Sequence, residues 1–354
     1  MDFIRILLFP ISCLYGLFMM CRNKLFDWKM LPVESYDIPV VSVGNITCCG
    51  TGKTPHIEYL IRLLQDKFNV GTLSYGYGRT SKGFVLGNSK SNHCDIGDES
   101  LQYVEKFDVN VAVDKNRRNG IKQLQKHSEK LDCILMDDGF QHRFVKPGMS
   151  ILLTDFHNLY VNDYPLPTGT LREFRAGAER ADIIIVTKTF SVFSPITKRR
   201  LTDLIKPKEH QQLYFTYIEY GDRVSLPGLK HQPERKKRYN TIVLFTGIAN
   251  SYPIQEYLRK YCSELILIEF PDHHKYSKRD LEKIKSTFFD VFSKNKVIIT
   301  TEKDAMRIIK TDLVELIQDL PIFYIPIEVK FHLEGSKSFD KQITDYVRKS
   351  KKNR

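Results

Sequence analysis

Short apolar runs alternate with amphipathic stretches along most of the chain. The runs are rich in Val, Ile and Leu, as expected for strands that are buried on both faces. The stretches between them carry apolar residues at helical spacing. This alternation predicts an α/β fold, in which strand–helix units surround mostly parallel sheets. The predicted strands are 38–43, 70–74, 109–113, 133–136, 150–154, 183–187, 241–246, 265–269, 297–301 and 322–325.

The N-terminus departs from this pattern. Ile6–Met20 contains no charged residue, and Arg5 precedes it while further cations follow it. The stretch is shorter than the roughly 20 residues that cross a bilayer, and Pro10 interrupts it. No small-residue cleavage site follows, so the pattern favours a retained segment in the membrane interface over a secretory signal. A buried first helix of the domain is the alternative.

Composition and charge narrow the function classes. The chain has 354 residues, 42% of them hydrophobic and 27% charged, which is typical of a globular protein. A net charge of +12 attracts an anionic partner such as a nucleotide, a nucleic acid, an acidic lipid or a phosphorylated substrate. The seven cysteines are scattered, without a C-x-x-C pair, which argues against a disulfide framework and a structural zinc site.

A Gly-Lys-Thr sequence follows the first predicted strand and opens a predicted helix. The order of strand, tight loop and helix aims backbone N–H groups and a helix N-terminus at phosphate oxygens. Gly50 and Gly52 allow a close approach of the backbone, while Lys53 is expected to reach the β and γ phosphates. The hydroxyl of Thr54 is expected to bind magnesium. This segment therefore predicts a phosphate-binding loop.

The loop departs from the G-x-x-x-x-G-K-[ST] consensus at its first position, where the chain has Thr47. This difference predicts a turn with other backbone dihedrals, and it leaves the chemistry of Lys53 and Thr54 intact. We interpret Cys48 and Cys49 as small space-filling residues rather than as redox or metal-binding residues.

Adjacent carboxylates follow the predicted strand 133–136. Asp137 and Asp138 come at the C-terminal edge of the sheet, where open α/β sheets bind their ligands. Neighbouring side chains of an extended chain point in different directions, so one carboxylate is expected to bind a metal directly. The other would act through water or through Lys53. Acids that form a turn before Gly139 are the alternative reading.

Three further clusters carry candidate chemistry. Asp98 and Glu99 stand at a predicted helix start, where they serve either as caps or as a general base. Arg172 and Glu173 lie in a Pro/Gly-rich loop, which suits a phosphate contact and a metal-shell carboxylate; a surface ion pair is the alternative. The adjacent histidines at 273–274 favour one histidine paired with a carboxylate over a shared metal.

Taken together and in order, these motifs resemble one family, the tetraacyldisaccharide 4'-kinases, which are the lipid A 4'-kinases of Gram-negative bacteria. The resemblance covers most of the chain and rests on the stretches VSVGNITCCGTGKTP, LSYGYGRTSKGF, IGDES, ILMDDGFQHR, PTGTLREF, LFTGIAN, FPDHHKY and TTEKDAMR. It implies a P-loop NTPase-like fold of two α/β/α sandwich domains joined by a small β linker, with the active site in the cleft. We accordingly expect a membrane-associated segment at 1–30, a nucleotide-binding domain at 31–160 and a second α/β domain at 161–354.

The resemblance also implies an activity. The γ-phosphate of ATP would pass, with Mg²⁺, to the 4'-hydroxyl of an acylated glucosamine disaccharide 1-phosphate lipid, forming lipid IVA in lipid A biosynthesis. The enzyme would be a peripheral or monotopic protein on the cytoplasmic face of the bacterial inner membrane. Its partners would be that lipid and the membrane surface; no nucleic acid and no protein partner is expected.

Roles for individual residues follow from the same resemblance. It implies that Asp98 is the catalytic base, assisted by His273, and that Lys53 is the third catalytic residue. Arg79, Glu99 and Arg172 would face the substrate. The nucleotide loop would comprise Thr47, Cys48, Cys49, Gly50, Thr51, Gly52, Lys53 and Thr54, and magnesium would lie among Thr54, Asp137, Asp138 and Glu173.

Two other function classes remain as alternatives. A membrane-associated P-loop switch or chaperone without a small-molecule acceptor would read guanine with Asn-Lys-x-Asp. The nearest match places Glu302 before Lys303 and Asp304, where that motif requires Asn. A nucleic-acid-binding protein would require a recognition motif of aromatic and basic residues, and the sequence contains none.

Overall fold

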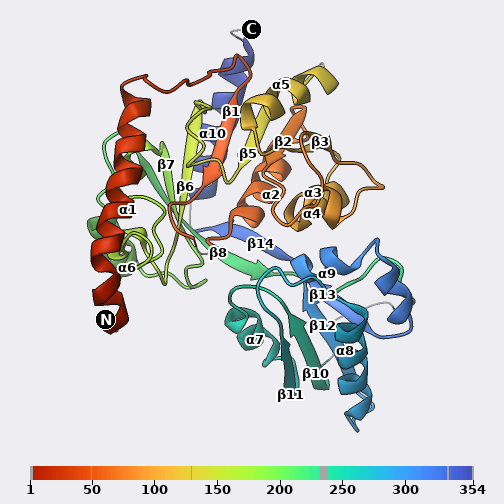
Figure 1. The fold of residues 1–354 in the computed structure, drawn as a ribbon. Coiled ribbons are helices and arrows are strands. Elements are labelled where there is room, and N and C mark those ends of the chain that lie inside the picture. Colours follow the sequence, from red (N-terminus) through yellow and green to blue (C-terminus); the bar gives the residue numbers. More distant parts are fainter. Residues whose placement is uncertain (1–2, 49, 129, 232–237, 333–334, 353–354) are drawn as a thin grey trace.

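The computed structural model describes residues 3–48, 50–128, 130–231, 238–332 and 335–352. Within these ranges the chain forms two mostly parallel sheets, as Figure 1 shows. The larger sheet contains, in spatial order, β14 (Ile327–Phe331), β8 (Gln212–Tyr220), β7 (Ile183–Thr187), β6 (Met149–Asp155), β1 (Val40–Gly44), β5 (Cys133–Asp137), β2 (Val70–Ser74), β4 (Asn110–Val113) and β3 (Val85–Leu86). The smaller contains β11 (Cys262–Glu269), β10 (Tyr239–Thr246), β12 (Lys296–Thr301), β13 (Ile322–Ile325) and β9 (Val224–Ser225).

Helices cover both faces of each sheet. The described helices are α1 (Phe3–Asp27), α2 (Lys53–Leu64), α3 (His93–Ile96), α4 (Asp98–Lys106), α5 (Arg117–His127), α6 (Pro195–Ile205), α7 (Tyr252–Leu258), α8 (Lys278–Asp290), α9 (Glu302–Ile308) and α10 (Gly335–Lys352). Successive side chains of a strand point to opposite faces. Accordingly, Ile151 of β6 packs in one core with α2 and α10, while its neighbour Leu152 packs in another with α6.

The smaller sheet is built in the same way. Its core against α8 and α9 contains Val243 of β10, and its core against α7 contains the neighbouring Leu244. The first of these cores also includes Leu101 of α4, which belongs to the larger part of the molecule. The α/β fold class predicted from the sequence is therefore confirmed, and apolar packing continues from one sheet to the other.

A pair of antiparallel strands connects the two sheets. The chain leaves the larger sheet along β8, builds the smaller sheet, and returns along β14, which pairs with β8 from Thr216 to Tyr220. Figure 1 shows these two strands running between the sheets. The boundary expected between 160 and 161 falls between β6 and β7, which are adjacent parallel strands of the larger sheet.

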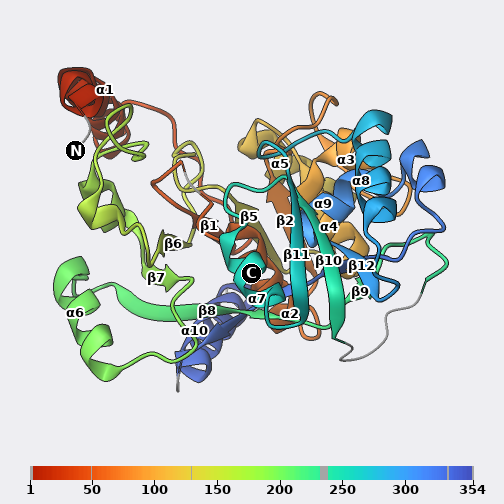
Figure 2. The ribbon, with the colours of Figure 1, turned by 90° about the horizontal axis from the view of Figure 1, so that it is seen from below.

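The N-terminal helix lies at the side of the larger sheet, as Figures 1 and 2 show. Many of its apolar side chains are exposed, among them Leu7, Leu14 and Phe18. In the part of the chain that the structure describes, no helix is both long enough and apolar enough to span a membrane.

Candidate active site

The phosphate-binding loop connects β1 to α2 and is fixed by buried polar groups. The Asn45 side chain donates to the hydroxyls of Thr47 (3.3 Å) and Thr51 (3.0 Å). Thr187, at the end of β7, donates to the carbonyl of Thr51 at 2.9 Å. Thr47 forms an isolated antiparallel bridge with Leu171, so its backbone is extended and does not require glycine. Cys49 lies outside the described residues.

The loop ends at Gly52, whose φ of 85° is in the left-handed region that glycine tolerates best. His56, one turn into α2, lies 2.7 Å from the Gly52 carbonyl and 3.1 Å from the Thr216 hydroxyl. Burial lowers the pKa of His56 to about 4, so the ring is neutral near pH 7. A neutral ring that donates to Gly52 and accepts from Thr216 ties the loop to β8, a contact that the sequence did not suggest.

Lys53 and Thr54, the first residues of α2, face carboxylates. The Lys53 ammonium lies 3.4 Å from Oδ1 of Asp138, and Arg172 lies 3.2 Å from Oδ2 of the same carboxylate. Burial opposes the ionisation of Asp138, but the charges of Lys53 and Arg172 outweigh it and lower its pKa. The Thr54 hydroxyl donates to Oε1 of Glu99 at 3.2 Å. The structure therefore brings together several residues that the sequence had suggested separately.

Asp137 is the other carboxylate at the end of β5, and its side chain is buried. Its Oδ2 accepts a hydrogen bond from the Tyr103 hydroxyl at 3.0 Å, whereas its buried Oδ1 has no hydrogen-bond partner among the described residues. Burial, together with the negative charge of Glu99, raises the pKa of Asp137 to about 7. An unpartnered buried oxygen beside further oxygen donors suits a hard cation.

These oxygen donors suit a magnesium site that phosphate oxygens and waters complete, rather than a site closed by protein ligands alone. Mg²⁺ is usually bound by one or two carboxylates, with phosphate oxygens and waters completing an octahedron. The described residues contain no cluster of three His, Cys, Asp or Glu side chains with the geometry of a metal site. Thr54 and Asp137 supply the oxygens that such a partial site requires.

Glu173, which the resemblance implies lies near magnesium, is buried and surrounded by hydrogen-bond donors. It accepts hydrogen bonds from Arg180 and Asn23, both at 2.8 Å, and from Gln141 at 3.3 Å. Both of its carboxylate oxygens thus have partners. Glu99, which the resemblance placed toward the substrate, is the carboxylate beside Thr54.

Asp98 is the first residue of α4, and both sheets contribute to its surroundings. Its Oδ2 accepts from Arg307 through Nη2 at 2.6 Å and Nε at 2.9 Å, and lies 3.2 Å from Nδ1 of His273. Burial opposes ionisation, but the hydrogen bond from His273 and the charges of Lys303 and Arg307 hold the pKa of Asp98 well below its usual range. The predicted pairing of Asp98 with a single histidine is present.

Helix α9 supplies two cations that the sequence reading did not assign to the site. Lys303 donates to Glu99 at 2.7 Å, and Arg307 bridges Asp98 and Asp304. The sequence contained a signal for these two residues, because both lie in the TTEKDAMR stretch. That stretch contributed to the family resemblance, but no role was assigned to its lysine and arginine. Glu99 and Asp98, the partners that belong to the site, lie about 200 positions earlier in the chain, so local spacing does not reveal them.

The residues that the resemblance implies face the substrate are not all gathered in one place. Arg172 contacts Asp138 and the Gln141 side chain, beside Lys53. Arg79 instead donates to Ser81 and to the Gly83 carbonyl, and it lies 3.5 Å from the carbonyl of Val113. Among the described residues, Arg79 therefore contacts its own loop and the end of β4 rather than the carboxylates of the site.

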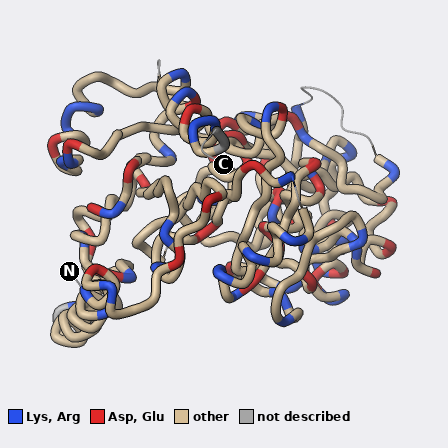
Figure 3. The backbone as a smooth tube through the Cα atoms, turned by 90° about the horizontal axis from the view of Figure 1, so that it is seen from above, with Lys and Arg blue, Asp and Glu red and all other residues tan. Residues whose placement is uncertain are grey.

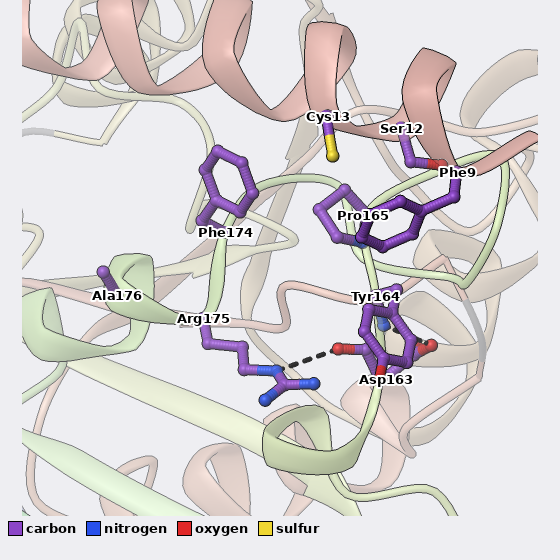
Figure 4. A pocket seen from close by; sticks show the side chains of 9 residues that line it. All are labelled: Phe9, Ser12, Cys13, Asp163, Tyr164, Pro165, Phe174, Arg175 and Ala176. Atoms are coloured by element: carbon purple, nitrogen blue, oxygen red, sulfur yellow. Dashed lines mark hydrogen bonds between the residues drawn. The ribbon is translucent and has the colours of Figure 1, made fainter.

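A largely apolar cavity of about 370 Å³ lies between α1 and the loop that leads to Arg172. Figure 4 shows the rings of Phe9 and Phe174 at its sides, and Tyr164 below the helix. Arg175 closes one end, where its Nε donates to the Asp163 carbonyl at 2.9 Å. The cavity therefore adjoins the segment that carries Arg172.

Comparisons with known proteins find relatives along the whole chain. The family model described as Tetraacyldisaccharide-1-P 4'-kinase matches residues 4–348. The tetraacyldisaccharide 4'-kinase of Parabacteroides distasonis is 42% identical over 354 residues, covering 96% of this chain and 94% of that protein. The corresponding enzyme of Flavobacterium johnsoniae is 43% identical and covers 99% of both chains. The crystal structure of LpxK from Aquifex aeolicus in complex with ATP superimposes with a TM-score of 0.73 and 26% identity, covering 97% of this chain and 99% of that one.

Proposed function

Because the chain belongs to the tetraacyldisaccharide-1-P 4'-kinase family, we propose a division of its reaction between the two sheets. The protein is a phosphotransferase of lipid A biosynthesis that phosphorylates the 4' position of a tetraacyldisaccharide. In our proposal the larger sheet binds the phosphates and the smaller sheet orients the base. The observation that carries it is the meeting of Asp98 with His273 and Arg307 across the two sheets.

The phosphate donor is ATP, held by the loop from Thr47 to Thr54. The related LpxK was crystallised with ATP, and the loop of this chain has the strand–loop–helix form that binds phosphates. Lys53 neutralises charge on the transferred phosphoryl group, as the lysine of such loops does. It leaves Asp138 for the phosphate when the nucleotide binds, because the two acceptors compete for one ammonium.

Magnesium belongs at Thr54 and Asp137, with Glu99 and Asp138 around them. The unpartnered buried Oδ1 of Asp137 supports this assignment, since a carboxylate with a raised pKa gains most from a nearby cation. When bound, the ion would spread the negative charge of the phosphates and of the transition state. We assign Glu173 to positioning the loop, because its oxygens accept hydrogen bonds from Arg180 and Asn23.

Asp98 takes the proton from the 4'-hydroxyl as the oxygen attacks phosphorus. A carboxylate that accepts hydrogen bonds from His273 and Arg307 stays ionised across the physiological range, so it is ready to accept a proton. His273 orients the carboxylate through its hydrogen bond to Oδ2.

The acceptor is an acylated glucosamine disaccharide 1-phosphate, which approaches from the side of α1. Arg172 offers a cation for its phosphate, and the cavity between α1 and Phe174 offers an apolar surface for part of an acyl chain. The exposed apolar residues of α1 then lie in the headgroup boundary of the inner membrane, on its cytoplasmic face, as in a peripheral protein.

Phosphate transfer from labelled ATP tests this proposal. Purified protein, magnesium and the disaccharide 1-phosphate lipid in mixed micelles should give 4'-phosphorylated product. Lys53→Met should lower the rate about 10²-fold or more, because a charge-stabilising group is removed. Lys67→Met removes an exposed cation near the C-terminal end of α2 and should leave the rate unchanged. Hydrolysis of ATP without transfer to the lipid would contradict the proposal.

A further inference from the structure

The segment between β7 and the first turns of α6 exposes apolar side chains beside a group of cations. Val192 is 89% exposed and Ile196 82%, and Phe190 is also largely exposed. Lys198, Arg199 and Arg200 follow in α6, and all three are exposed. We call these six residues the β7–α6 surface.

This surface belongs to a fixed part of the molecule. At its start, Lys188 donates to the carbonyl of Gly50 in the phosphate-binding loop and pairs with Asp155 at 2.8 Å. Ser194 caps α6 by accepting from the Thr197 backbone N–H at 3.1 Å. The helix buries Leu201 beneath it. Phe190 contacts the ring of Phe156 with one edge, whereas Val192 and Ile196 are almost fully exposed.

The surface lies on the same side of the molecule as α1. Figures 1 and 2 are related by a turn about the horizontal axis, which leaves the left-hand side in place, and α1 and α6 both mark that side in each view. Figure 3 shows Lys and Arg spread along most of the chain, interspersed with Asp and Glu. A flat surface laid against this side would touch both helices.

We propose that the β7–α6 surface is a second contact with an anionic bilayer, which acts together with α1. Apolar side chains that enter the headgroup boundary and cations that pair with anionic lipids form the usual combination of an interfacial membrane contact. Asp203 is the one acidic residue among the exposed residues of α6, so the exposed side of this helix carries a net positive charge. The inference rests on the membrane placement proposed above and extends it to a second point.

Two membrane contacts would fix the orientation of the protein on the bilayer, which α1 alone cannot do. A protein held by α1 alone can pivot about that helix, whereas separated contacts fix its tilt. Since Lys188 joins the same segment to Gly50, this tilt also sets the height of the phosphate-binding loop above the lipid headgroups. A fixed height suits an enzyme whose acceptor carries acyl chains.

Tryptophan placement tests the proposal directly, because Trp28 is the single tryptophan of the chain. In a Trp28→Phe background, Val192→Trp should show a blue shift with vesicles of phosphatidylglycerol and phosphatidylethanolamine, and quenching by brominated lipid. Leu14→Trp reports on α1 in the same way. Phe292→Trp, at a fully exposed aromatic position of the smaller sheet's domain, is the matched control and should show neither change.

The outcomes separate the two proposals. Quenching of Leu14→Trp without quenching of Val192→Trp would overturn the second contact and leave the α1 contact standing. Absence of quenching at both positions would overturn both. Equal quenching at positions 192 and 292 would mean nonspecific adsorption and would also overturn the inference.

Charge variants provide a second measurement. The pair Arg199→Gln and Arg200→Gln should weaken binding to anionic vesicles several-fold at low salt and leave binding to neutral vesicles unchanged. The matched pair Arg279→Gln and Lys283→Gln removes two exposed cations from α8 and should have no effect. Equal loss in both pairs would show a general charge effect and contradict a local contact.

Discussion

Asp98 illustrates how a buried carboxylate is prepared to act as a base. Its ordinary pKa would already leave it ionised near pH 7, and the partners around it lower that pKa further. A lower pKa makes a carboxylate a weaker base, so its value lies in position rather than in strength. Arg307 and His273 both contact Oδ2 and fix the orientation of the carboxylate. Holding a catalytic group in the correct position supplies much of the rate enhancement of an enzyme.

The first prediction compares neighbouring histidines. His273→Ala should lower kcat by about 10² to 10⁴, because the base loses the partner that orients it. His274→Ala is the control, since His274 pairs with Asp280 at 3.1 Å rather than with Asp98. The measurement is kcat at saturating ATP, together with the Kd of a fluorescent nucleotide, which should not change. Equal losses in the two variants would refute the assignment.

The second prediction concerns Asp137 and pH. Its pKa of about 7 lies above that of an unfolded chain, so the folded state binds this proton more tightly. The stability that this proton contributes is complete below pH 4 or so and is lost as the pH rises through 7. Asp137→Asn keeps an acceptor for Tyr103 and has no proton to lose, so it should be more stable than the parent at pH 8.

Thermal unfolding from pH 5 to pH 8, without nucleotide and with a chelator, measures this effect. The difference in unfolding free energy between Asp137→Asn and the parent, obtained from the Tm values, should grow with pH to about 1 kcal/mol or more. Magnesium should stabilise the parent at pH 8 and should stabilise the variant less. A difference that does not vary with pH would contradict the raised pKa.

The sequence contains enough information to predict parts of this site. Lys53, Thr54 and Asp138 follow from local patterns, since each adjoins a strand or helix end where ligands bind. Glu99 and Glu173 could not be distinguished in this way, because both are carboxylates in loops or at helix starts. Only the tertiary structure shows that one faces Thr54 and that the other is engaged by Arg180.

At the scale of elements, α1 has two faces with different tasks. On one face, Ser12 donates to Thr168 at 2.7 Å, and Tyr15 donates to the Arg172 carbonyl at 3.0 Å. Asn23 reaches Glu173 near the end of the helix. The opposite face is apolar and exposed. The alternative of a buried first helix therefore describes the docked face, while the membrane contact stays a proposal for the exposed face.

The third prediction tests the docked face at Gly16. A Cβ added there would lie 2.4 Å from Cζ of Phe174, so Gly16→Ala should force α1 away from the loop. Overpacking of this kind costs about 1 to 3 kcal/mol, and activity on the lipid should fall with it. Phe174→Leu, combined with Gly16→Ala, makes room for the new methyl group and should restore both.

Chemical unfolding and lipid phosphorylation measure the two effects. Gly335→Ala is the control, because the nearest atom to its added Cβ lies 3.7 Å away, at an ordinary contact distance. The docking model fails if Gly16→Ala matches the parent in both assays, or if the double variant is no better than the single one.

Some strands were absent from the sequence prediction, and their positions explain why. β8 and β14 link the two sheets and are only partly buried, so polar residues such as Glu219 and Glu328 interrupt their apolar runs. β3 and β9 have two residues each and carry no pattern. The ten strands that were predicted all coincide with strands of the structure, because each contains an apolar run, and most of these runs are buried between helices; the edge strand β11 is the partly exposed exception.

For the whole molecule, the contact between α4 and α9 unites the two sheets beside the site. Lys106 of α4 pairs with Glu302 of α9 at 2.8 Å and with Glu58 of α2 at 2.7 Å. Lys303 and Arg307 continue the contact toward Asp98. The sequence could not reveal this arrangement, because the chain completes the larger sheet only after building the smaller one.

The final prediction concerns Arg307 as the residue that joins the two halves of the site. Arg307→Ala leaves Asp98 and Asp304 buried without their cation, which costs about 3 to 5 kcal/mol. Arg307→Lys keeps the charge and loses the planar fork, so it should recover only part of this stability. Without Arg307 the pKa of Asp98 rises, so the acidic limb of the kcat/KM profile, which lies below pH 5 in the parent, should move toward the measured range in Arg307→Ala and less in Arg307→Lys. Unfolding by denaturant and kcat/KM from pH 5 to 9 measure the two effects, with Arg259→Ala, an exposed arginine of the same domain, as the control. A purely structural role would lower stability and leave the acidic limb unmoved, whereas a positioning role shifts both, because the same guanidinium that closes the two sheets also holds the base in its ionised form.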